Sequence, residues 1–342
     1  MDKVAIAILN YNGKEYLETF LPSVISNSPE ATIWVIDNNS TDDSVDFLTK
    51  NFSSVKQIVL KENGGYSRGY NLGLDQIEAE YYVLLNSDVE VTSNWLNPLI
   101  ELMDSDKTIA ASQPKILDFN NKQLFEYAGA GGGFIDTFGY PFCRGRLFLT
   151  LEKDEGQFND VQRIFWATGA CLVIRASEFK KHGPLDEDFF AHMEEIDLCW
   201  RLNNAGLKVM YNGKSTVYHV GGGTLKKSNP KKTYLNFRNG LALLYKNYLR
   251  WELWLKLPIR IALDMVACVK FMLFDSFDDG VAVLKAHFHF ILDLPSNFKK
   301  RKKINQRAVG GAFPPIYKGS IVFDYFIKGK RKFSQLGINN TK

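Results

Sequence analysis

Polar side chains with the chemistry of a metal site stand directly after a run of buried-strand residues. In Leu84-Leu85-Asn86-Ser87-Asp88-Val89, an amide and a carboxylate follow two leucines. Oxygen donors of this kind suit a hard divalent cation, which can bind a substrate diphosphate at the same time. The residues also fit an Asx turn that only ends a strand. The segment therefore predicts a metal and diphosphate site beside that structural alternative.

A second acidic segment, residues 183–201, combines carboxylates with Phe and Trp. If a helix begins at Glu194, Asp197 and Arg201 lie four positions apart and can pair, whereas Glu195 lies about 200° around the helix from Asp197. Asp197 is then structural, and Glu194 or Glu195 is freer to act as a general base. The alternative is a solvated acidic helix start that favours the helix dipole.

Two further segments carry glycine beside polar side chains. Tyr218-His219-Val220-Gly221-Gly222-Gly223 follows an expected strand over 208–217, and its glycines would let the backbone approach a phosphate. A lone histidine is, however, often only a hydrogen-bonded structural residue. Residues 62–73 form a glycine-rich turn entering a helix, which suits a diphosphate, although a plain tight turn explains them as well. The chain contains neither GxGxxG nor GxxxxGKS/T, so a dinucleotide oxidoreductase and a P-loop NTPase lose their main support.

The elements that must position these residues repeat a pattern of strand, turn and helix. Continuous apolar runs predict strands buried on both faces, and helical spacing predicts helices between them. The strands are expected at 4–9, 33–36, 57–60 and 81–85, and the helices at 14–26 and 67–77. This alternation predicts an α/β fold with a mostly parallel sheet flanked by helices. Ligands of such sheets bind outside the carboxyl ends of the strands, where this chain has Tyr11, Asp37, Asn63 and Asp88.

The charge of the chain divides at residue 224. Residues 1–224 hold 19 Lys and Arg against 31 Asp and Glu, whereas residues 225–342 hold 23 against 7. This asymmetry predicts that the tail faces a polyanion, either a nucleic acid or an anionic lipid surface. Trp and Phe beside a polybasic run at 299–303 suit a membrane interface. An amphipathic helical pair packed on the rest of the protein is the alternative.

Cysteine usage and hydropathy bear on location. The four cysteines have no CxxC spacing and no signal peptide precedes them, so neither a zinc knuckle nor a disulfide framework is expected. Charged residues interrupt the most apolar region, 251–274, which argues against a membrane-spanning helix there. We therefore expect a cytoplasmic protein, with peripheral attachment at the inner face of the cell membrane as a further expectation.

Seven blocks of the sequence, taken in order, resemble the family 2 glycosyltransferases of GT-A fold, in particular the bacterial rhamnosyltransferase-like members. The blocks are ILNYNG, WVIDNNSTDDS, ENGGYSRGYNLGL, YYVLLNSDVEV, TGACLVIRASEF, GPLDEDFFAHMEEIDLCWRL and VYHVGGG. The resemblance implies a Rossmann-like GT-A catalytic domain over 1–224, with a nucleotide-binding half at about 1–90 and an acceptor half at about 91–224. An amphipathic helical segment, 225–342, would follow.

The resemblance also implies a role for each site residue. Tyr11 and Asp37 match positions that hold a nucleotide base and ribose, and Asp37 would accept hydrogen bonds from a pyrimidine imide or ribose hydroxyls. The other candidates for nucleotide binding are Asn63, Gly65, Asn71 and Asn86. Asp88 matches the last acid of the family's DxD-type motif, which binds Mg²⁺ or Mn²⁺, with Asn86 where many members have Asp. His219 matches a histidine that completes the metal shell in related polymerising transferases.

The resemblance assigns the general base to Glu195, which matches the second acid of a Glu-Asp pair. Glu194 is the fallback, because Glu stands where Asp is usual. One base suits an inverting displacement: it takes the proton of the acceptor hydroxyl as that oxygen attacks the anomeric carbon. The implied enzyme uses a dTDP- or UDP-sugar, with dTDP-rhamnose among the candidates. Its acceptor would be a saccharide or polyprenyl-linked saccharide in cell-surface polysaccharide synthesis.

Three alternatives stay open. A catalytically silent nucleotide-sugar-binding module would keep the fold and lose metal affinity through Asn86. A nucleic-acid-binding protein would use the basic tail, but the chain shows no helix-turn-helix, zinc finger or RNA-binding aromatic signature, so no nucleic acid is expected. A sugar-nucleotide pyrophosphorylase would need a Gly-rich opening loop with Arg and Lys where this chain has Asn-Tyr-Asn-Gly.

Overall fold

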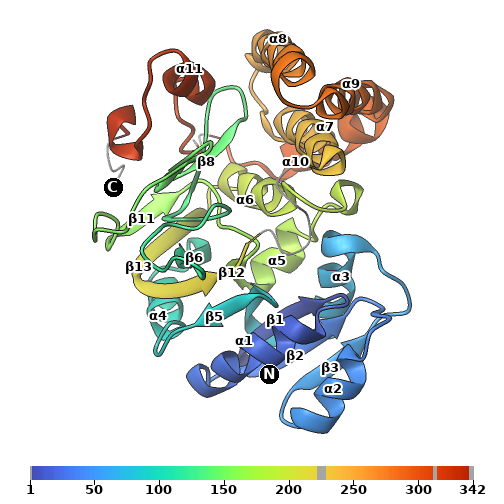
Figure 1. Cartoon of the computed structure of the whole chain (residues 1–342), viewed down its shortest axis with the longest axis vertical. Coiled ribbons are helices and arrows are strands. Elements are labelled where there is room, and N and C mark those ends of the chain that lie inside the picture. Colours follow the sequence, from blue (N-terminus) through green and yellow to red (C-terminus); the bar gives the residue numbers. More distant parts are fainter. Residues whose placement is uncertain (1, 222–228, 311–313, 339–342) are drawn as a thin grey trace.

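A central mixed sheet organises the molecule. The computed structural model describes residues 2–221, 229–310 and 314–338. Eight of the nine strands of the sheet follow the order β11-β13-β6-β12-β4-β1-β2-β3, and the ninth, β5, pairs with β13 outside this path. Helices flank the sheet, and α7 to α10 gather at one end of the molecule, away from the N-terminal strands (Figure 1).

The N-terminal part of the sheet is parallel. Its elements are β1 (Asp2–Asn10), α1 (Lys14–Asn27), β2 (Thr32–Asp37), α2 (Ser44–Asn51), β3 (Lys56–Val59), α3 (Gly65–Leu74) and β4 (Ala79–Asn86). β1 pairs in parallel with both β2 and β4, and β3 continues the sheet beside β2. The strands and helices predicted here are confirmed. Apolar residues cover both faces of this parallel region, which is why its strands are continuous apolar runs.

The second part of the sheet mixes directions. Its elements are β5 (Val89–Val91), α4 (Asn97–Ser105), β6 (Ile109–Asp118), β11 (Val161–Ile164), β12 (Cys171–Arg175), α5 (Ala176–His182), α6 (Glu194–Asn204) and β13 (Lys208–His219). β12 lies antiparallel between β4 and β6, whereas β13 runs parallel to β6. The strand predicted after residue 208 is confirmed, and it is the element that brings His219 back to the end of β4.

A small antiparallel sheet, which the sequence did not predict, covers one side of this core. It contains β7 (Gly133–Ile135), β8 (Pro141–Cys143), β9 (Arg146–Leu147) and β10 (Thr150–Leu151), and α11 (Ile321–Phe326) and η3 (Phe333–Leu336) follow near the end of the chain. Phe333 packs against Phe134 and Phe142 of this sheet, with ring centroids 5.0 and 6.3 Å away. The last part of the chain thus contributes to the main core.

The predicted C-terminal helical segment is also confirmed. It contains α7 (Pro230–Asn247), α8 (Leu253–Lys270), the π-helical turn η2 (Phe271–Asp275), α9 (Phe277–Leu292) and α10 (Leu294–Arg307). α7 packs against α6, α8, α9 and α10, so it joins the tail to the rest of the molecule. Among the helices of the described ranges, none has both the length and the hydropathy needed to cross a membrane.

Candidate active site

The ends of β4 and β13 meet through β5, and this pairing brings three predicted site residues together. His219 stands opposite Val89, the residue after Asp88. As a result, Nε2 of His219 lies 3.1 Å from Oδ1 of Asp88 and 3.4 Å from Nδ2 of Asn86. Asp88 and His219 are both buried. The predicted phosphate approach at Gly222 and Gly223 lies outside the described residues.

A further acid, Glu126, lies at this corner of the site and is not among the residues predicted from the sequence. Glu126 is 2% exposed, and its Oε1 lies 3.4 Å from Nδ1 of His219. Burial alone would lower the pKa of His219, but the carboxylates of Glu126 and Asp88 outweigh burial and raise that pKa to about 10. The one signal in the sequence is an acid between Phe125 and Tyr127, and nothing local connects it to His219.

The donor set of this corner fits a divalent cation that is shared with a substrate. Asp88 offers an oxygen. Nε2 of His219 would become a donor when a cation replaces the proton that Asp88 and Glu126 favour on the ring, and Glu126 at Nδ1 would fix the ring and its tautomer. Across the described ranges, no group of three or more His, Cys, Asp and Glu side chains is arranged to hold a metal alone. Two protein donors with open positions are what a cation needs when substrate phosphates supply its other ligands.

The two candidate bases begin α6, as the sequence predicted. The predicted pair is confirmed, since Nε of Arg201 lies 2.9 Å from Oδ2 of Asp197. Burial raises the pKa of Glu195 to about 7, although backbone N–H groups oppose this shift. Burial and the neighbouring Glu195 raise the pKa of Glu194 well above its usual range. A carboxyl that ionises near neutral pH is suited to general-base work, which favours Glu195 over Glu194.

One turn, residues 168–170, contacts both Glu195, the candidate base, and the candidate metal corner formed by Asn86, Asp88, Glu126 and His219. The carbonyl of Ala170 accepts a hydrogen bond from the backbone of Asn86 at 3.0 Å. The backbone N–H of Gly169 lowers the pKa of Glu195, so this turn contacts the base as well. The hydroxyl of Tyr66, on α3, donates a hydrogen bond to the carbonyl of Gly169 at 2.8 Å and also holds this turn. Glu195 and the strand end that carries Asn86 and Asp88 are therefore connected through this one turn.

The predicted nucleoside-binding residues stand at the ends of β1 and β2. Tyr11 is 48% exposed, so its ring is accessible to a base. Asp37 is 2% exposed, and its two carboxylate oxygens accept hydrogen bonds from the backbone of Ser40 at 2.8 Å and from Nδ2 of Asn10 at 3.1 Å. Asp37 thus holds the loop after β2, and its contact with a nucleoside stays a prediction.

Of the three candidates in the glycine-rich turn, Gly65 and Asn71 pack α3 against residues 183–193, whereas Asn63 bonds within the turn. Oδ1 of Asn63 accepts a hydrogen bond from the backbone of Gly65 at 2.9 Å. Gly65 has φ +78°, and a Cβ there would lie 2.7 Å from the ring of Phe190. The amide of Asn71 both donates to and accepts from the backbone of Leu185, at 2.9 Å each. These bonds do not support nucleotide contact by Asn71, which remains a prediction.

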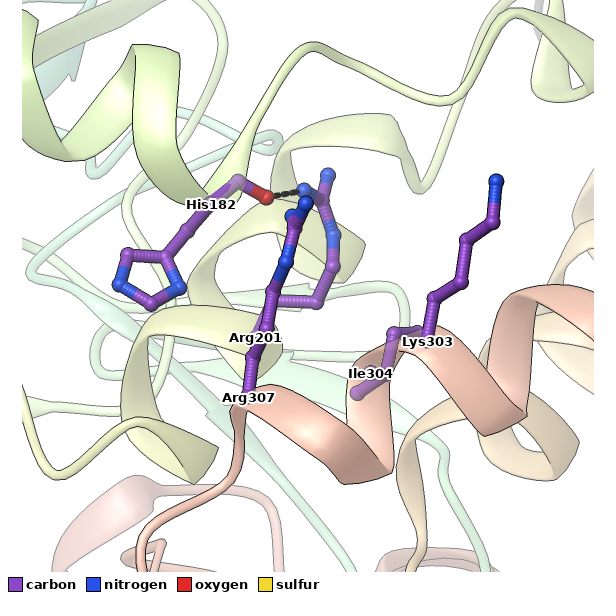
Figure 2. A pocket seen from close by; sticks show the side chains of 5 residues that line it. All are labelled: His182, Arg201, Lys303, Ile304 and Arg307. Carbon is purple, nitrogen blue, oxygen red and sulfur yellow. Dashed lines mark hydrogen bonds between the residues drawn. The ribbon is translucent and has the colours of Figure 1, made fainter.

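Figure 2 shows a pocket elsewhere, lined by His182, Arg201, Lys303, Ile304 and Arg307. These residues come from α5, α6 and α10, and none of them is a predicted site residue. The carbonyl of His182 accepts a hydrogen bond from Arg201 in this pocket (Figure 2). The pocket therefore belongs to the packing of α10 beside α5 and α6.

Comparison with curated proteins finds glycosyltransferases. The low-salt glycan biosynthesis hexosyltransferase Agl10 of Haloferax volcanii is 25% identical over 247 residues, which cover 70% of this chain and 74% of the relative. The N-acetylglucosaminyl-diphospho-decaprenol L-rhamnosyltransferase of Mycobacterium tuberculosis is 24% identical over 285 residues, which cover 76% of this chain and 92% of the relative. The expected likeness to rhamnosyltransferases is thereby confirmed.

Comparison with solved structures identifies the fold. The crystal structure of GalNAc-T7 with UDP, GalNAc and Mn²⁺ superposes with a TM-score of 0.57 at 19% identity, over 86% of this chain and 58% of that one. This likeness confirms the expected GT-A fold. The family model described as Glycosyl transferase family 2 matches residues 5–181, more than half of the chain. The protein is therefore a glycosyltransferase and belongs to glycosyl transferase family 2.

Proposed function

We propose that the protein is an inverting glycosyltransferase in which Glu195 is the general base. The observation that carries this proposal is the position of Glu195. The turn 168–170 contacts Glu195 and also bonds the end of β4, where Asp88 pairs with His219. Its pKa of about 7 allows it to be ionised at neutral pH, whereas burial and the neighbouring Glu195 raise the pKa of Glu194 well above its ordinary value. A single ionised carboxylate suits a single displacement with inversion, because retention by double displacement needs a second carboxylate as nucleophile.

In this reaction the acceptor oxygen forms a bond to the anomeric carbon of the donor sugar. Glu195 takes the proton of that hydroxyl, and the bond between the anomeric carbon and the diphosphate breaks, with its electron pair leaving on the diphosphate. A divalent cation held by Asp88 and His219, Mg²⁺ or Mn²⁺, would supply charge stabilisation for the departing diphosphate. Glu126 would keep His219 oriented toward that cation.

For the donor we propose a pyrimidine nucleoside diphosphate sugar, dTDP- or UDP-linked, with dTDP-rhamnose as the first candidate. The accessible ring of Tyr11 supports a nucleoside at this end of the sheet, where Asp37 holds the loop after β2. UDP is bound in the GalNAc-T7 structure, and the Mycobacterium tuberculosis relative is named as a rhamnosyltransferase. Residues 1–90 would bind this donor and residues 91–224 the acceptor.

For the acceptor we propose a polyprenyl-diphosphate-linked saccharide in cell-surface polysaccharide synthesis. The Mycobacterium tuberculosis relative is named for such an acceptor, N-acetylglucosaminyl-diphospho-decaprenol. A lipid-linked acceptor stays at the membrane, so a protein that uses it gains from attachment to the membrane surface. We therefore also propose peripheral attachment of this protein to an anionic membrane surface.

The exposed faces of α8, η2 and α9 support the attachment. Helices packed on a protein usually turn polar side chains to water, but these turn apolar ones outward at intervals of three and four residues. The exposed apolar residues include Leu255, Ile259, Val266, Val269 and Leu273 along α8 and η2, and Phe277, Val281, Leu284, Phe288 and Ile291 along α9. Trp251 and Trp254, 70% and 63% exposed, stand at one end of α8, where a bilayer interface would favour them.

The polybasic run contributes less to this surface than its sequence suggests. Lys300 pairs with Asp186 and with Asp188, so its charge is used within the protein. Arg301 donates hydrogen bonds to the carbonyl groups of Tyr245 and Tyr248. Only the remaining cations of residues 299–303, Lys299, Lys302 and Lys303, are exposed. Apolar contact, with help from these three charges, would therefore dominate attachment.

The proposed reaction is tested by assaying sugar transfer with Mn²⁺, a panel of dTDP- and UDP-sugars, and a polyprenyl-diphosphate-linked N-acetylglucosamine acceptor. We expect transfer with the opposite anomeric configuration in the product, measured by NMR, and a loss of about 100-fold or more in Glu195→Gln. Glu101→Gln, an exposed acid on α4, is the matched control and should keep full activity. Retained configuration, or a fully active Glu195→Gln, would refute the assignment.

A further inference from the structure

The segment that leads into the two glutamates has a costly backbone conformation. Phe190, His192 and Met193 have φ angles of 62°, 70° and 75°. Each such angle costs a non-glycine residue on the order of 1 kcal/mol, so the segment keeps this conformation only if its surroundings hold it. The conformation matters because Met193 is the residue directly before α6, and its carbonyl accepts a hydrogen bond from the backbone of Asp197 at 2.9 Å.

Asn239 of α7 stabilises this backbone conformation through three hydrogen bonds. Its side chain is fully buried, and Nδ2 lies 3.1 Å from the carbonyl oxygen of Phe189, 3.0 Å from that of Ala191 and 2.8 Å from that of His192. Two amide hydrogens thus serve three carbonyl groups within one tight segment. A single side chain from the tail therefore fixes the path of the chain just before the base.

Arg238 sets the orientation of that amide. Nε and Nη2 of Arg238 donate hydrogen bonds to Oδ1 of Asn239, at 2.9 and 2.8 Å. Because a guanidinium can only donate, Oδ1 must face Arg238 and Nδ2 must face the segment. Nη2 of Arg238 also donates to the carbonyl of Asp188, so the arginine holds the start of the same segment.

A second set of contacts anchors the C-terminal end of α7. Nζ of Lys246, which is 1% exposed, pairs with Asp186 and lies 3.0 Å from Oδ1 of Asp197. Nδ2 of Asn247 donates to the same oxygen of Asp197 at 2.7 Å. Both the segment before α6 and the first turns of α6 are therefore tied to α7.

We propose that Arg238 and Asn239 are positioning residues that hold the 188–193 segment so that Glu195 faces the acceptor hydroxyl. This inference rests on the proposed role of Glu195. It places part of the catalytic apparatus in the tail, beyond residue 224 and beyond the residues 5–181 that match the family model. The tail is thus required for the chemical step, separately from any role at a membrane.

The surroundings of Glu195 give this inference a readout besides activity. The titratable groups that face Glu195 are Glu194 and Cys199 of α6, Tyr66 of α3 and Cys143 of β8. None of these described groups is a cation, and burial is the main cause of the raised pKa. A loosened segment would admit water beside Glu195 and lower its pKa toward the ordinary value.

The experiment compares Asn239→Asp with the matched control Asn236→Asp, a half-buried position on the same helix. Asn239→Asp keeps the shape of the side chain and the bonds to Arg238 but cannot donate to the three carbonyl groups. We expect kcat to fall about 100-fold with the donor KM changed less than twofold, because a small misplacement of the base weakens only the chemical step. The acid limb of the kcat–pH profile should move to lower pH. Asn236→Asp should match the wild type in all three measurements.

A second variant, Arg238→Met, decides the outcome if Asn239→Asp does not fold, as judged by circular dichroism. It frees the amide of Asn239 to rotate, and we expect a smaller loss of kcat, about 10-fold, with the same shift of the acid limb. Wild-type kcat and pH profile in a folded variant would overturn the positioning role, while an inactive Glu195→Gln would still support the base. A fully active Glu195→Gln would overturn the proposed function instead.

Discussion

Glu195 owes its proton affinity to burial, and this has a kinetic consequence. Burial raises its pKa to about 7, and as the proposed base Glu195 must be ionised to take the proton of the acceptor hydroxyl. We therefore predict that kcat of the wild type falls about tenfold per pH unit below pH 7 and is flat above it. The measurement is a kcat–pH profile with saturating donor and Mn²⁺. A profile that stays flat down to pH 5.5 would contradict the assignment of Glu195.

The same raised pKa predicts a pH-dependent cost in stability. The folded state holds the Glu195 proton more tightly than the unfolded chain, whose glutamate has its ordinary pKa of 4.5. Raising the pH from 4.5 to 7 therefore lowers the free energy of unfolding, by about 3 kcal/mol for a shift of this size. Glu195→Gln removes this cost. Its advantage in melting temperature over the wild type should be larger at pH 8 than at pH 5, and an equal difference at both pH values would contradict the prediction.

The features that could be predicted from the sequence are those that depend on residue patterns within one strand or helix. The apolar runs of β1, β2 and β4 and the pairing of Asp197 with Arg201 depend on residues close in the chain, so the sequence shows them directly. Glu126 and Asn239 could not be predicted, because each reaches its partner only through the register of β13 with its neighbours or the packing of α7 on α6. Strands of two or three residues, as in the sheet of β7 to β10, carry too short an alternation to be predicted.

The pairing of β5 with β13 leads to a prediction about the metal corner. Glu126→Gln keeps the shape of the side chain but removes the negative charge that lies 3.4 Å from Nδ1 of His219 and that would orient the ring. We expect Mn²⁺ affinity in the presence of UDP to fall about 10-fold, as for other partners of metal-bound histidines. Isothermal titration calorimetry measures this, with Glu90→Gln, whose partner Lys122 is half-exposed, as control. Equal affinity in Glu126→Gln would show that Glu126 does not support a metal ligand.

At the scale of the whole molecule, the tail divides into helices that pack on the rest of the protein and helices that expose apolar side chains. α7 and α10 face inward, where Lys246 and Lys300 pair with acids of the 183–201 segment, so these two positive charges of the tail are neutralised within the protein. α8, η2 and α9 instead turn apolar side chains outward. That the tail faces an anionic surface stays a prediction, and its charge contributes less to such a surface than the sequence suggests, because Lys246 and Lys300 pair within the protein.

The exposed apolar face makes a last prediction, about attachment of the intact protein. We expect flotation with liposomes that contain phosphatidylserine, and loss of most binding in Val266→Glu/Phe288→Glu, because both side chains are exposed, 69% and 59%, on the face that would enter the lipid. Doubling the salt concentration should weaken binding only slightly, since the three exposed lysines of residues 299–303 contribute less than the apolar contact. Lys328→Glu, on the loop after α11, is the control and should bind as the wild type does. Absence of flotation by the wild type would refute attachment, and a self-associating protein that does not float would show that a second copy covers this face.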